Sequence, residues 1–428
     1  MKTAALSLEA LREAVGRLPD DRLAPMRQQA LAQLGETGLP TTRHEDWKYT
    51  DLTAVVELSN RWLSAPATQH AAKDLAGVVE SIRGQVEAHW LVITNGRVDD
   101  ASLARCRDAG VAASLLSEAD VGLHSPFPLT QLNTALLQDG IALRISADQE
   151  LDRPVGLLVL DQGAEAGSVS QARIEIRMAP NSRADFIEYH ASLGGAQHYG
   201  NSVVNLEVGD GAQANYLRIQ DRHRQHAQTG RLDVRLARDS RFAHCGFDLG
   251  GAFVRNDLNI SIDGPGAAAA FDGLYLGGHD QHIDNHTRID HRVGPAESRQ
   301  EYRGIAAGNA RCVWNGKAIV HVGADGTDAA QANHNLLLSD KAEIDAKPEL
   351  EIYADDVKCS HGTTVGQLDE ASLYYLRTRG LDKPFAQRVL TRAFAQAIVS
   401  RAPVAAAGTL LTGLIEDRLG RMLEVLQQ

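Results

Sequence analysis

The sequence predicts a mainly β protein whose core is a parallel β-helix, with helical segments before and after it. Between residues 141 and 365, short runs alternate apolar and polar residues, as in residues 173–177, 203–208, 232–236 and 258–262. Such alternation is typical of strands that bury one face. Turn signals separate the runs at a nearly constant spacing, which is typical of stacked units of two strands and two turns.

The turn signals form a regular series along the chain. Asn181, Asp210 and Asp239 open turn sequences at two equal intervals, and Gly264 and Pro295 follow after intervals of similar length. A β-sandwich is the alternative, but its strands pair through hairpins and need no constant spacing. The series therefore favours a β-helix, expected over residues 139–365.

Residues 1–138 are expected to form a mostly helical N-terminal domain. Apolar residues at helical spacing predict helices around residues 8–15, 26–34 and 129–137, and residues 89–97 read as a strand that ends in an Asn-Gly turn. Between them, residues 43–50 (RHEDWKYT) combine charged and aromatic side chains. We expect Trp47 and Tyr49 to be packing residues rather than a binding box.

Residues 366–428 are expected to form a C-terminal helical domain. One helix spans residues 370–378 and ends near Gly380, and a second begins at residues 382–384 with a proline in its first turn. Thr409 is expected to cap a last helix, whose apolar stripe runs to Leu426.

The composition excludes several classes of protein. The 428 residues are 43% hydrophobic and 23% charged, and 43 basic against 55 acidic residues give a net charge of −12. An acidic chain is a poor ligand for nucleic acid or an anionic membrane. The sequence has no apolar run near the ~18–20 residues of a membrane span, and its N-terminal apolar stretch stops at Glu9, too short for a secretory signal. A cytoplasmic location is expected.

Motifs for metal clusters and nucleotides are also missing from the sequence. Cys106, Cys245, Cys312 and Cys359 lie far apart, and no CxxC occurs. The first three are expected to be buried small residues. Residues 315–317 (NGK) come nearest to a P-loop but lack its other residues.

A histidine-rich run at residues 278–291 is one candidate site. In a strand, His282, His286, Asp284 and Asp290 share one face, and their chemistry suits a metal. The alternative is a polar ladder on the outer face, with Ile283 and Ile289 inside. We favour the ladder, because residues four apart on a strand lie about 13 Å apart.

Cys359 and His361 are the second candidate site. Two residues apart on a strand, they point the same way, and a thiolate beside an imidazole suits iron, zinc or sulfur transfer. Lys358 and His361 are expected to favour the thiolate. The alternative is a buried cysteine with a capping histidine. Two ligands do not complete a metal site, so others must come from elsewhere or from a second chain.

Longer motifs resemble a known family. The stretch 333–366 closely resembles the SufB/SufD family of iron–sulfur cluster assembly proteins, and residues 282–287, 302–304 and 373–381 fit as well. The opening at residues 43–50 and the shorter chain resemble the SufD branch of that family rather than SufB.

The resemblance implies a right-handed parallel β-helix flanked by helical domains, in a non-catalytic scaffold subunit. Such a subunit pairs with SufB and binds the ATPase SufC, which hydrolyses ATP. It takes part in iron acquisition and in building a transient cluster at the SufB–SufD interface, with no tightly bound cofactor in the isolated chain. The chain could also form a homodimer in isolation.

The resemblance also assigns roles to individual residues. His361 would be a metal ligand facing a SufB cysteine, and Cys359 would assist. The residues that would dock the ATPase are Tyr374, Tyr375, Leu376, Arg377 and Arg379.

Three rival functions stay open at this point. A β-helix carbohydrate-active enzyme would use the carboxylates of Asp280, Asp284 and Asp290, although only 5% of the residues are aromatic and sugar grooves usually offer aromatic platforms. An adaptor would need neither Cys359 nor His361. An iron-entry factor would use the histidine-rich run.

Overall fold

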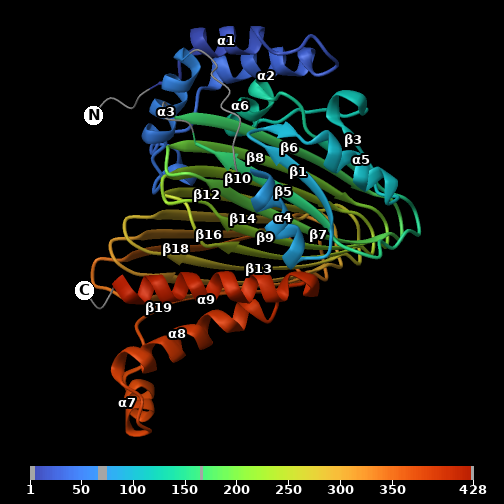
Figure 1. Ribbon diagram of the computed structural model, residues 1–428. Coiled ribbons are helices and arrows are strands. Elements are labelled where there is room, and N and C mark those ends of the chain that lie inside the picture. Colours follow the sequence, from blue (N-terminus) through green and yellow to red (C-terminus); the bar gives the residue numbers. More distant parts are fainter. Residues whose placement is uncertain (1–4, 66–74, 164–166, 426–428) are drawn as a thin grey trace.

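A computed structural model describes residues 5–65, 75–163 and 167–425, and a parallel β-helix forms its centre (Figure 1). From β4 onward, successive strands alternate between two sheets, and their neighbours pair in parallel. The first sheet has the spatial order β19 (Lys358–Gly366), β17 (Asp328–Leu337), β15 (Glu297–Ala306), β13 (Ala268–Gly277), β11 (Arg241–Asp248), β9 (Gln213–Asp221), β7 (Arg183–Leu193), β5 (Val155–Gln162), β1 (His89–Thr94) and β2 (Arg97–Val98). The second has the order β18 (Glu343–Ile352), β16 (Arg311–Val320), β14 (His282–His291), β12 (Phe253–Ile262), β10 (His226–Leu236), β8 (His198–Val208), β6 (Ser168–Met178), β4 (Ile141–Ile145) and β3 (Ala112–Leu115).

The strand register explains the repeat in the sequence. Ser168 pairs with His198 in the next turn of the β-helix, and His198 pairs with His226 in the turn after that. Successive turns also bond to one another, since the Asn181 N–H donates to the Asp210 carbonyl. The predicted β-helix is confirmed and the β-sandwich alternative is wrong.

The interior of the β-helix is built from rows of side chains that stack from strand to strand. Ile176, Leu206, Val234, Ile260 and Ile289 are consecutive partners in the second sheet, and each is fully buried. Full burial of such a side chain is worth about 1.5–3 kcal/mol. A single turn of the β-helix cannot bury its own apolar side chains, so successive turns of the β-helix stabilise one another.

Helices cover the N-terminal end of the β-helix. They are α1 (Leu8–Gly16), α2 (Ala24–Thr37), α3 (Thr53–Ser64), α4 (Leu75–Gln85), α5 (Asp100–Asp108) and α6 (Pro128–Leu136), with the short helices η1 (Glu45–Trp47) and η2 (Leu116–Glu118). The helices predicted around residues 8–15, 26–34 and 129–137 are confirmed. The predicted Asn-Gly turn joins β1 to β2, with positive φ at Asn95 and Gly96. β1 also adds to the first sheet beside β5, so this part of the chain is continuous with the core.

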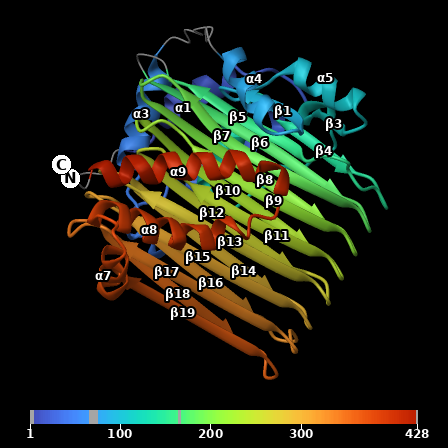
Figure 2. The same ribbon diagram turned by 60° about the horizontal axis from the view of Figure 1, so that its bottom comes forward.

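The C-terminal helices lie on and beyond the first sheet. They are α7 (Glu370–Thr378), α8 (Lys383–Val399), η3 (Ala405–Ala407) and α9 (Gly408–Val425). α8 and α9 cross the outer face of the first sheet, where Leu411, Ile415 and Leu419 pack against its apolar residues (Figure 2). α7 projects from the body of the molecule (Figure 1).

Two details of the helical segments differ from expectation or lie outside the structure. The predicted cap at Thr409 is wrong, because α9 follows η3 directly and begins at Gly408. The N-terminal residues 1–4 and Leu426 of the predicted last stripe fall outside the described residues. Over the described ranges, no helix is both long and apolar enough to cross a membrane.

Candidate functional site at the open end of the β-helix

The two sheets end in β18 and β19, which are the last strands of the stack. We call the end that they form the open end. Within residues 5–65, 75–163 and 167–425, no strand pairs with the outer edge of either one. An unpaired strand edge is a ready template for pairing with another chain.

Cys359 and His361 lie on β19 and face the interior side of the open end. Cys359 is the register partner of Ala329 and His361 that of Gln331, and both partners are buried inside the β-helix. Because β19 is the last strand of its sheet, these two positions face solvent instead of a further turn of the β-helix. Cys359 is half-buried and His361 is exposed. The alternative of a buried cysteine with a capping histidine is therefore wrong.

The backbone of these two residues faces the free edge. The Lys358 N–H donates to the Thr327 carbonyl at 2.8 Å, so Lys358 bonds inward to the preceding turn of chain. Along a strand the bonding groups of successive residues point to opposite sides. The N–H and C=O groups of Cys359, His361 and Thr363 therefore point to the edge where a further strand could add.

The electrostatics at Cys359 differ from expectation. Partial burial raises the pKa of its thiol above the ordinary value, and the nearby Asp328 carboxylate raises it further. The expectation that Lys358 and His361 favour the thiolate is wrong. Cys359 is a thiol at neutral pH and can become a metal ligand only when the metal displaces its proton.

The other three cysteines are buried, as predicted. Burial raises the pKa of the Cys106 thiol to about 11 and that of Cys312 to about 12. Cys245 faces the outer apolar layer, while His244 points to the opposite face and stacks on Phe242 and Tyr216. These cysteines are packing residues.

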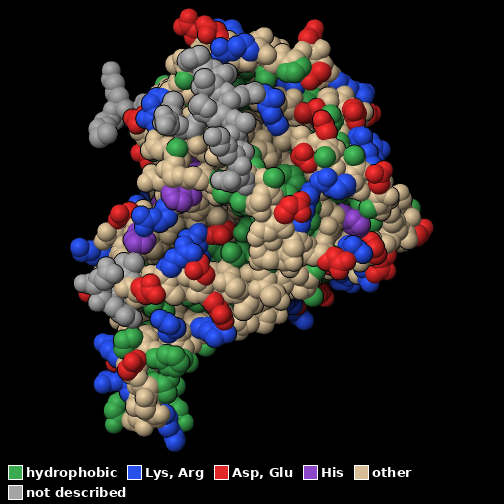
Figure 3. Space-filling model, viewed as in Figure 1, with side chains coloured by type: hydrophobic (Ala, Val, Ile, Leu, Met, Phe, Trp, Pro, Cys, Tyr) green, Lys and Arg blue, Asp and Glu red, His purple; other side chains and the backbone are tan. Residues whose placement is uncertain are grey.

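The predicted docking residues lie on the projecting helix α7 and at its C-cap. Tyr374 and Tyr375 are 70% and 57% exposed, Leu376 is half-buried, and the Arg379 guanidinium lies 5.3 Å from the centre of the Tyr375 ring. Arg377 is also exposed. Apolar side chains gather on this projecting part of the surface (Figure 3). Leu376 therefore packs partly within the chain, whereas Tyr375 does not.

The histidine-rich run forms β14, and its polar-ladder interpretation is confirmed. Ile283 and Ile289 are buried inside. On the outer face, Asp284 accepts a 2.6 Å hydrogen bond from Arg255 and lies 3.2 Å from His286. Asp290 pairs with Arg288 and His321. In the part of the chain that the structure describes, no three His, Cys, Asp or Glu side chains converge as metal ligands. Cys359 and His361 are thus at most half of a site.

A segment far away in the sequence covers β14. Residues 45–50, which we call the N-terminal strap, lie across the outer face of the second sheet. The Trp47 ring lies 4.4 Å from the Arg255 guanidinium, the Asp46 carbonyl accepts from Arg255, and the Thr50 hydroxyl donates to Asp284. The strap also reaches the open end, because Glu45 pairs with Lys347 of β18 at 2.8 Å. The packing role predicted for Trp47 is confirmed.

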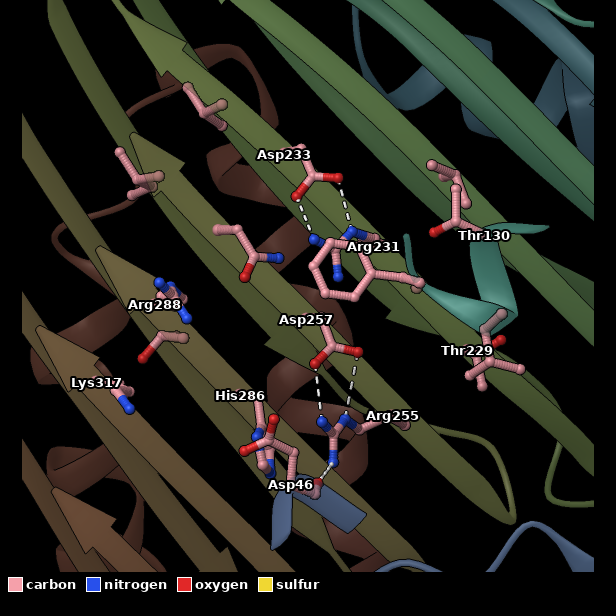
Figure 4. A pocket seen from close by; sticks show the side chains of 18 of the residues that line it. Asp46, Thr130, Thr229, Arg231, Asp233, Arg255, Asp257, His286, Arg288 and Lys317 are labelled. Carbon is pink, nitrogen blue, oxygen red and sulfur yellow. Dashed lines mark hydrogen bonds and ion pairs between the residues drawn. The ribbon is translucent and has the colours of Figure 1, made fainter. Parts of the chain in front are cut away.

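A groove of about 560 Å³ lies between the strap and the start of α6 (Figure 4). Its floor carries arginines that bind a carboxylate two residues along the same strand, as Arg231 binds Asp233 and Arg255 binds Asp257. The Phe127 ring covers Arg231 at 3.4 Å. The arginines on the floor are therefore already neutralised.

Comparisons with known proteins agree with this architecture. A family model described as SUF system FeS cluster assembly, SufBD core domain, matches residues 160–394. The iron–sulfur cluster assembly protein SufD of Escherichia coli is 31% identical over 383 residues, which cover 87% of each chain. An iron–sulfur cluster assembly SufBD family protein of Synechocystis is 28% identical over 422 residues, covering 93% of this chain and 92% of that one.

Proposed function

The chain belongs to the SufB/SufD family of iron–sulfur cluster assembly proteins and is SufD-like, and from this premise we propose that it is the SufD-type subunit of a complex with a SufB-type subunit and the ATPase SufC. In that complex it is a non-catalytic scaffold that takes part in iron acquisition and in building the nascent cluster. The observation that carries the proposal is the incomplete ligand pair on a free strand edge.

The geometry of the open end supports pairing with the SufB-type subunit. A strand added to β19 would bond to the outward-facing backbone of Cys359, His361 and Thr363. The partner's side chains would then lie next to the exposed imidazole of His361. Iron and zinc sites usually need four ligands, so two from this chain leave the rest to the partner. The cluster or iron is cargo shared between the two chains.

The projecting helix α7 supports docking of the ATPase. The sequence has no P-loop of its own, so ATP hydrolysis belongs to the partner. Tyr374, Tyr375 and Arg377 are exposed on α7, Arg379 is exposed at its C-cap, and Leu376 lies half-buried beside them. Interfaces are enriched in tyrosine and arginine, which often carry most of the binding energy.

The contacts of the carboxylates disfavour the carbohydrate-active alternative. Hydrolysis of a glycosidic bond needs two carboxyl groups that flank an accessible bond. Asp284 and Asp290 are buried and bound to arginine and histidine, and Asp280 accepts a hydrogen bond from Asn309.

The test of the site is cluster assembly by the complete complex with its SufB-type and SufC partners. We expect His361→Ala to leave the complex intact and to lower the rate of cluster formation at least ten-fold, and Cys359→Ser to lower it less. His334→Ala is the matched control, because His334 lies on the neighbouring β17 but on the opposite face, bonded to Thr364. Assembly by His361→Ala at the wild-type rate would show that His361 has no such role.

The test of the docking surface is the affinity of SufC for the full chain. We expect Tyr375→Ala to weaken binding about ten-fold or more, which is the usual range for an aromatic anchor of an interface. Leu8→Ala is the control, because Leu8 is a partly exposed apolar residue at the opposite end of the molecule. Equal affinities of the Tyr375→Ala and wild-type chains would place the docking surface elsewhere.

A further inference from the structure

Directly beneath the open end, the interior of the β-helix holds three buried amides. Gln331, Asn333 and Asn335 face inward from β17, and buried polar side chains such as Glu188 and His190 also face inward in earlier turns of the β-helix. In the row formed by Ile176, Leu206, Val234 and Ile260 the inward positions are apolar. A buried amide is unfavourable unless its donors and acceptors are bonded. The bonding partners of these amides therefore indicate what they do.

Two of the amides form a closed cluster with a buried tyrosine. The Tyr275 hydroxyl donates to Asn335 Oδ1 at 2.5 Å, and Asn335 Nδ2 donates to Asn333 Oδ1 at 2.5 Å. Asn333 Nδ2 donates in turn to the Tyr302 carbonyl at 3.3 Å. We call Tyr275, Asn333 and Asn335 the asparagine cluster.

The asparagine cluster bonds to the last strand. Asn335 Nδ2 donates to the Thr364 carbonyl at 3.1 Å, and the Thr363 hydroxyl donates to Asn333 Oδ1 at 3.4 Å. Gln331 is the register partner of His361 and reaches across the interior to β16. With its amide oriented to satisfy both groups, it donates to the Gly316 carbonyl and accepts from the Ala318 N–H. Side chains of β17 thus bond to β19 and to the opposite sheet.

Close packing fixes the cluster from the other side. A Cβ on Gly304 would lie 2.2 Å from the Tyr275 ring and 2.6 Å from Asn335 Oδ1, so only glycine fits there. Gly304 lies two residues after Tyr302, whose carbonyl accepts from Asn333. The missing side chain at Gly304 thus leaves the space that the Tyr275 ring and the Asn335 amide fill.

We propose that the asparagine cluster is a positioning device that holds β19, and with it His361, in place at the open end. A terminal strand packs against one neighbour only, so its backbone bonds are the easiest of the sheet to open. The cluster adds side-chain bonds to the backbone and to the Thr363 side chain of β19. Its consequence for cluster assembly rests on the proposed role of His361, whereas its effect on β19 does not.

Hydrogen exchange of the full chain tests the effect on β19. Tyr275→Phe removes only the hydroxyl, and we expect exchange of the β19 amides to rise about five-fold or more, the change expected for one lost buried hydrogen bond. Tyr199→Phe is the matched control, because that buried hydroxyl bonds to Thr229 far from the open end. It should leave β19 exchange unchanged. Equal exchange of β19 in the Tyr275→Phe and wild-type chains, or an equal rise in both variants, would overturn the proposal.

Two further readouts guard against a merely structural effect. Thr363 is exposed, so Thr363→Val removes one bond to the asparagine cluster without altering the core. We expect Thr363→Val to raise the exchange of the β19 amides. Thr363→Ser keeps the hydroxyl and should leave the exchange at the wild-type rate. The rate at which diethylpyrocarbonate modifies His361 should change in Tyr275→Phe and not in Tyr199→Phe. If Thr363→Val and Thr363→Ser behave alike, the cluster does not hold β19.

Cluster assembly by the complete complex separates this inference from the proposed function. Faster β19 exchange together with slower assembly in Tyr275→Phe supports both. Faster exchange with assembly at the wild-type rate supports the positioning role and contradicts the role of His361 in assembly.

Discussion

A proline at Thr363 separates the stability of the chain from its pairing with a partner. The Thr363 N–H points to the free edge of β19, since the bonding groups of Lys358 and alternate residues after it point inward. Proline is tolerated in an edge strand where its missing N–H faces solvent. Thr363→Pro should therefore leave the isolated chain folded, with a far-ultraviolet circular dichroism spectrum like that of the wild type.

Pairing with the SufB-type subunit should be weakened strongly by the same change. A strand added to β19 would lose the bond from the Thr363 N–H, and its own carbonyl would be buried without a donor. The loss of one such bond, with its partner left unsatisfied, costs about 2 kcal/mol. That cost corresponds to roughly thirty-fold in Kd.

Biolayer interferometry with the immobilised SufB-type subunit measures the effect. Thr363→Val is the control, because it keeps the N–H but, like proline, lacks the hydroxyl that bonds to Asn333. If Thr363→Pro is folded and binds as tightly as wild type, the partner does not add a strand to β19, and the argument from the free edge fails.

Three further predictions concern charge and stability. Asp284→Ala should lower the free energy of unfolding in urea by about 3 kcal/mol, because it removes one of the two carboxylates that neutralise the fully buried Arg255. The Asp46 side chain is exposed, so Asp46→Ala should change the free energy of unfolding by under about 0.5 kcal/mol. A similarly small loss in both variants would contradict the reasoning. Burial raises the pKa of Asp272 from 3.8 to about 6, so between these pH values the folded chain holds a proton that the unfolded chain has released. The free energy of unfolding should therefore fall by up to about 3 kcal/mol as the pH rises from 4 to 6. Asp272→Asn should remove this pH dependence, and an unchanged pH dependence would show that Asp272 is not its source. Alkylation of Cys359 by iodoacetamide should be slow at pH 7 and rise about ten-fold per pH unit up to pH 9, since the raised pKa keeps the thiol protonated, whereas a rate independent of pH would indicate a thiolate.

Local patterns in the sequence predict the individual strands and turns, and the constant spacing of the turns predicts that they stack into a β-helix. Alternation marks each strand, and the turn residues at Asn181 and Asp239 adopt the positive φ that asparagine and aspartate tolerate. Both signals lie within a few residues of the feature that they predict. The helices follow for the same reason, from apolar residues three and four apart.

The contacts of the N-terminal strap could not be predicted in the same way. Asp46 meets Arg255 across 209 residues, and Glu45 meets Lys347 across 302. No periodicity connects such positions, because the contacts depend on how the chain folds back over the second sheet. The charged and aromatic character of residues 43–50 shows only that they have partners, not which ones.

The site at Cys359 and His361 was predictable in part. Their spacing of two residues predicts a shared face on a strand, and the structure places both on the interior side of β19. Exposure and the raised pKa of the thiol depend on β19 being the last strand of its sheet. A sequence pattern shows that a strand exists, but it does not show whether another strand covers it.

The polar interior beneath the open end was missed because alternation assigns polar residues to the solvent face. In β17 alternation does not fix the inner face, because both parities contain apolar residues. Ala329, Gln331, Asn333, Asn335 and Leu337 share one parity, but Ala330, Ala332 and Leu336 lie on the other. The amides are seen to be inside only from the strand register and the burial.

The location of the ligand pair bears on how the proposed cargo is held and released. An exposed imidazole and a protonated thiol on a free edge can supply two of the four ligands that iron prefers. On the proposed function, the affinity of this chain alone for the cargo is low, and retention of the cargo depends on the second chain. On the proposed function, separation of the two edges removes half of the ligands at once. An edge site can thus bind a cluster during assembly and release it, whereas a site enclosed within the β-helix would have to unfold to do so.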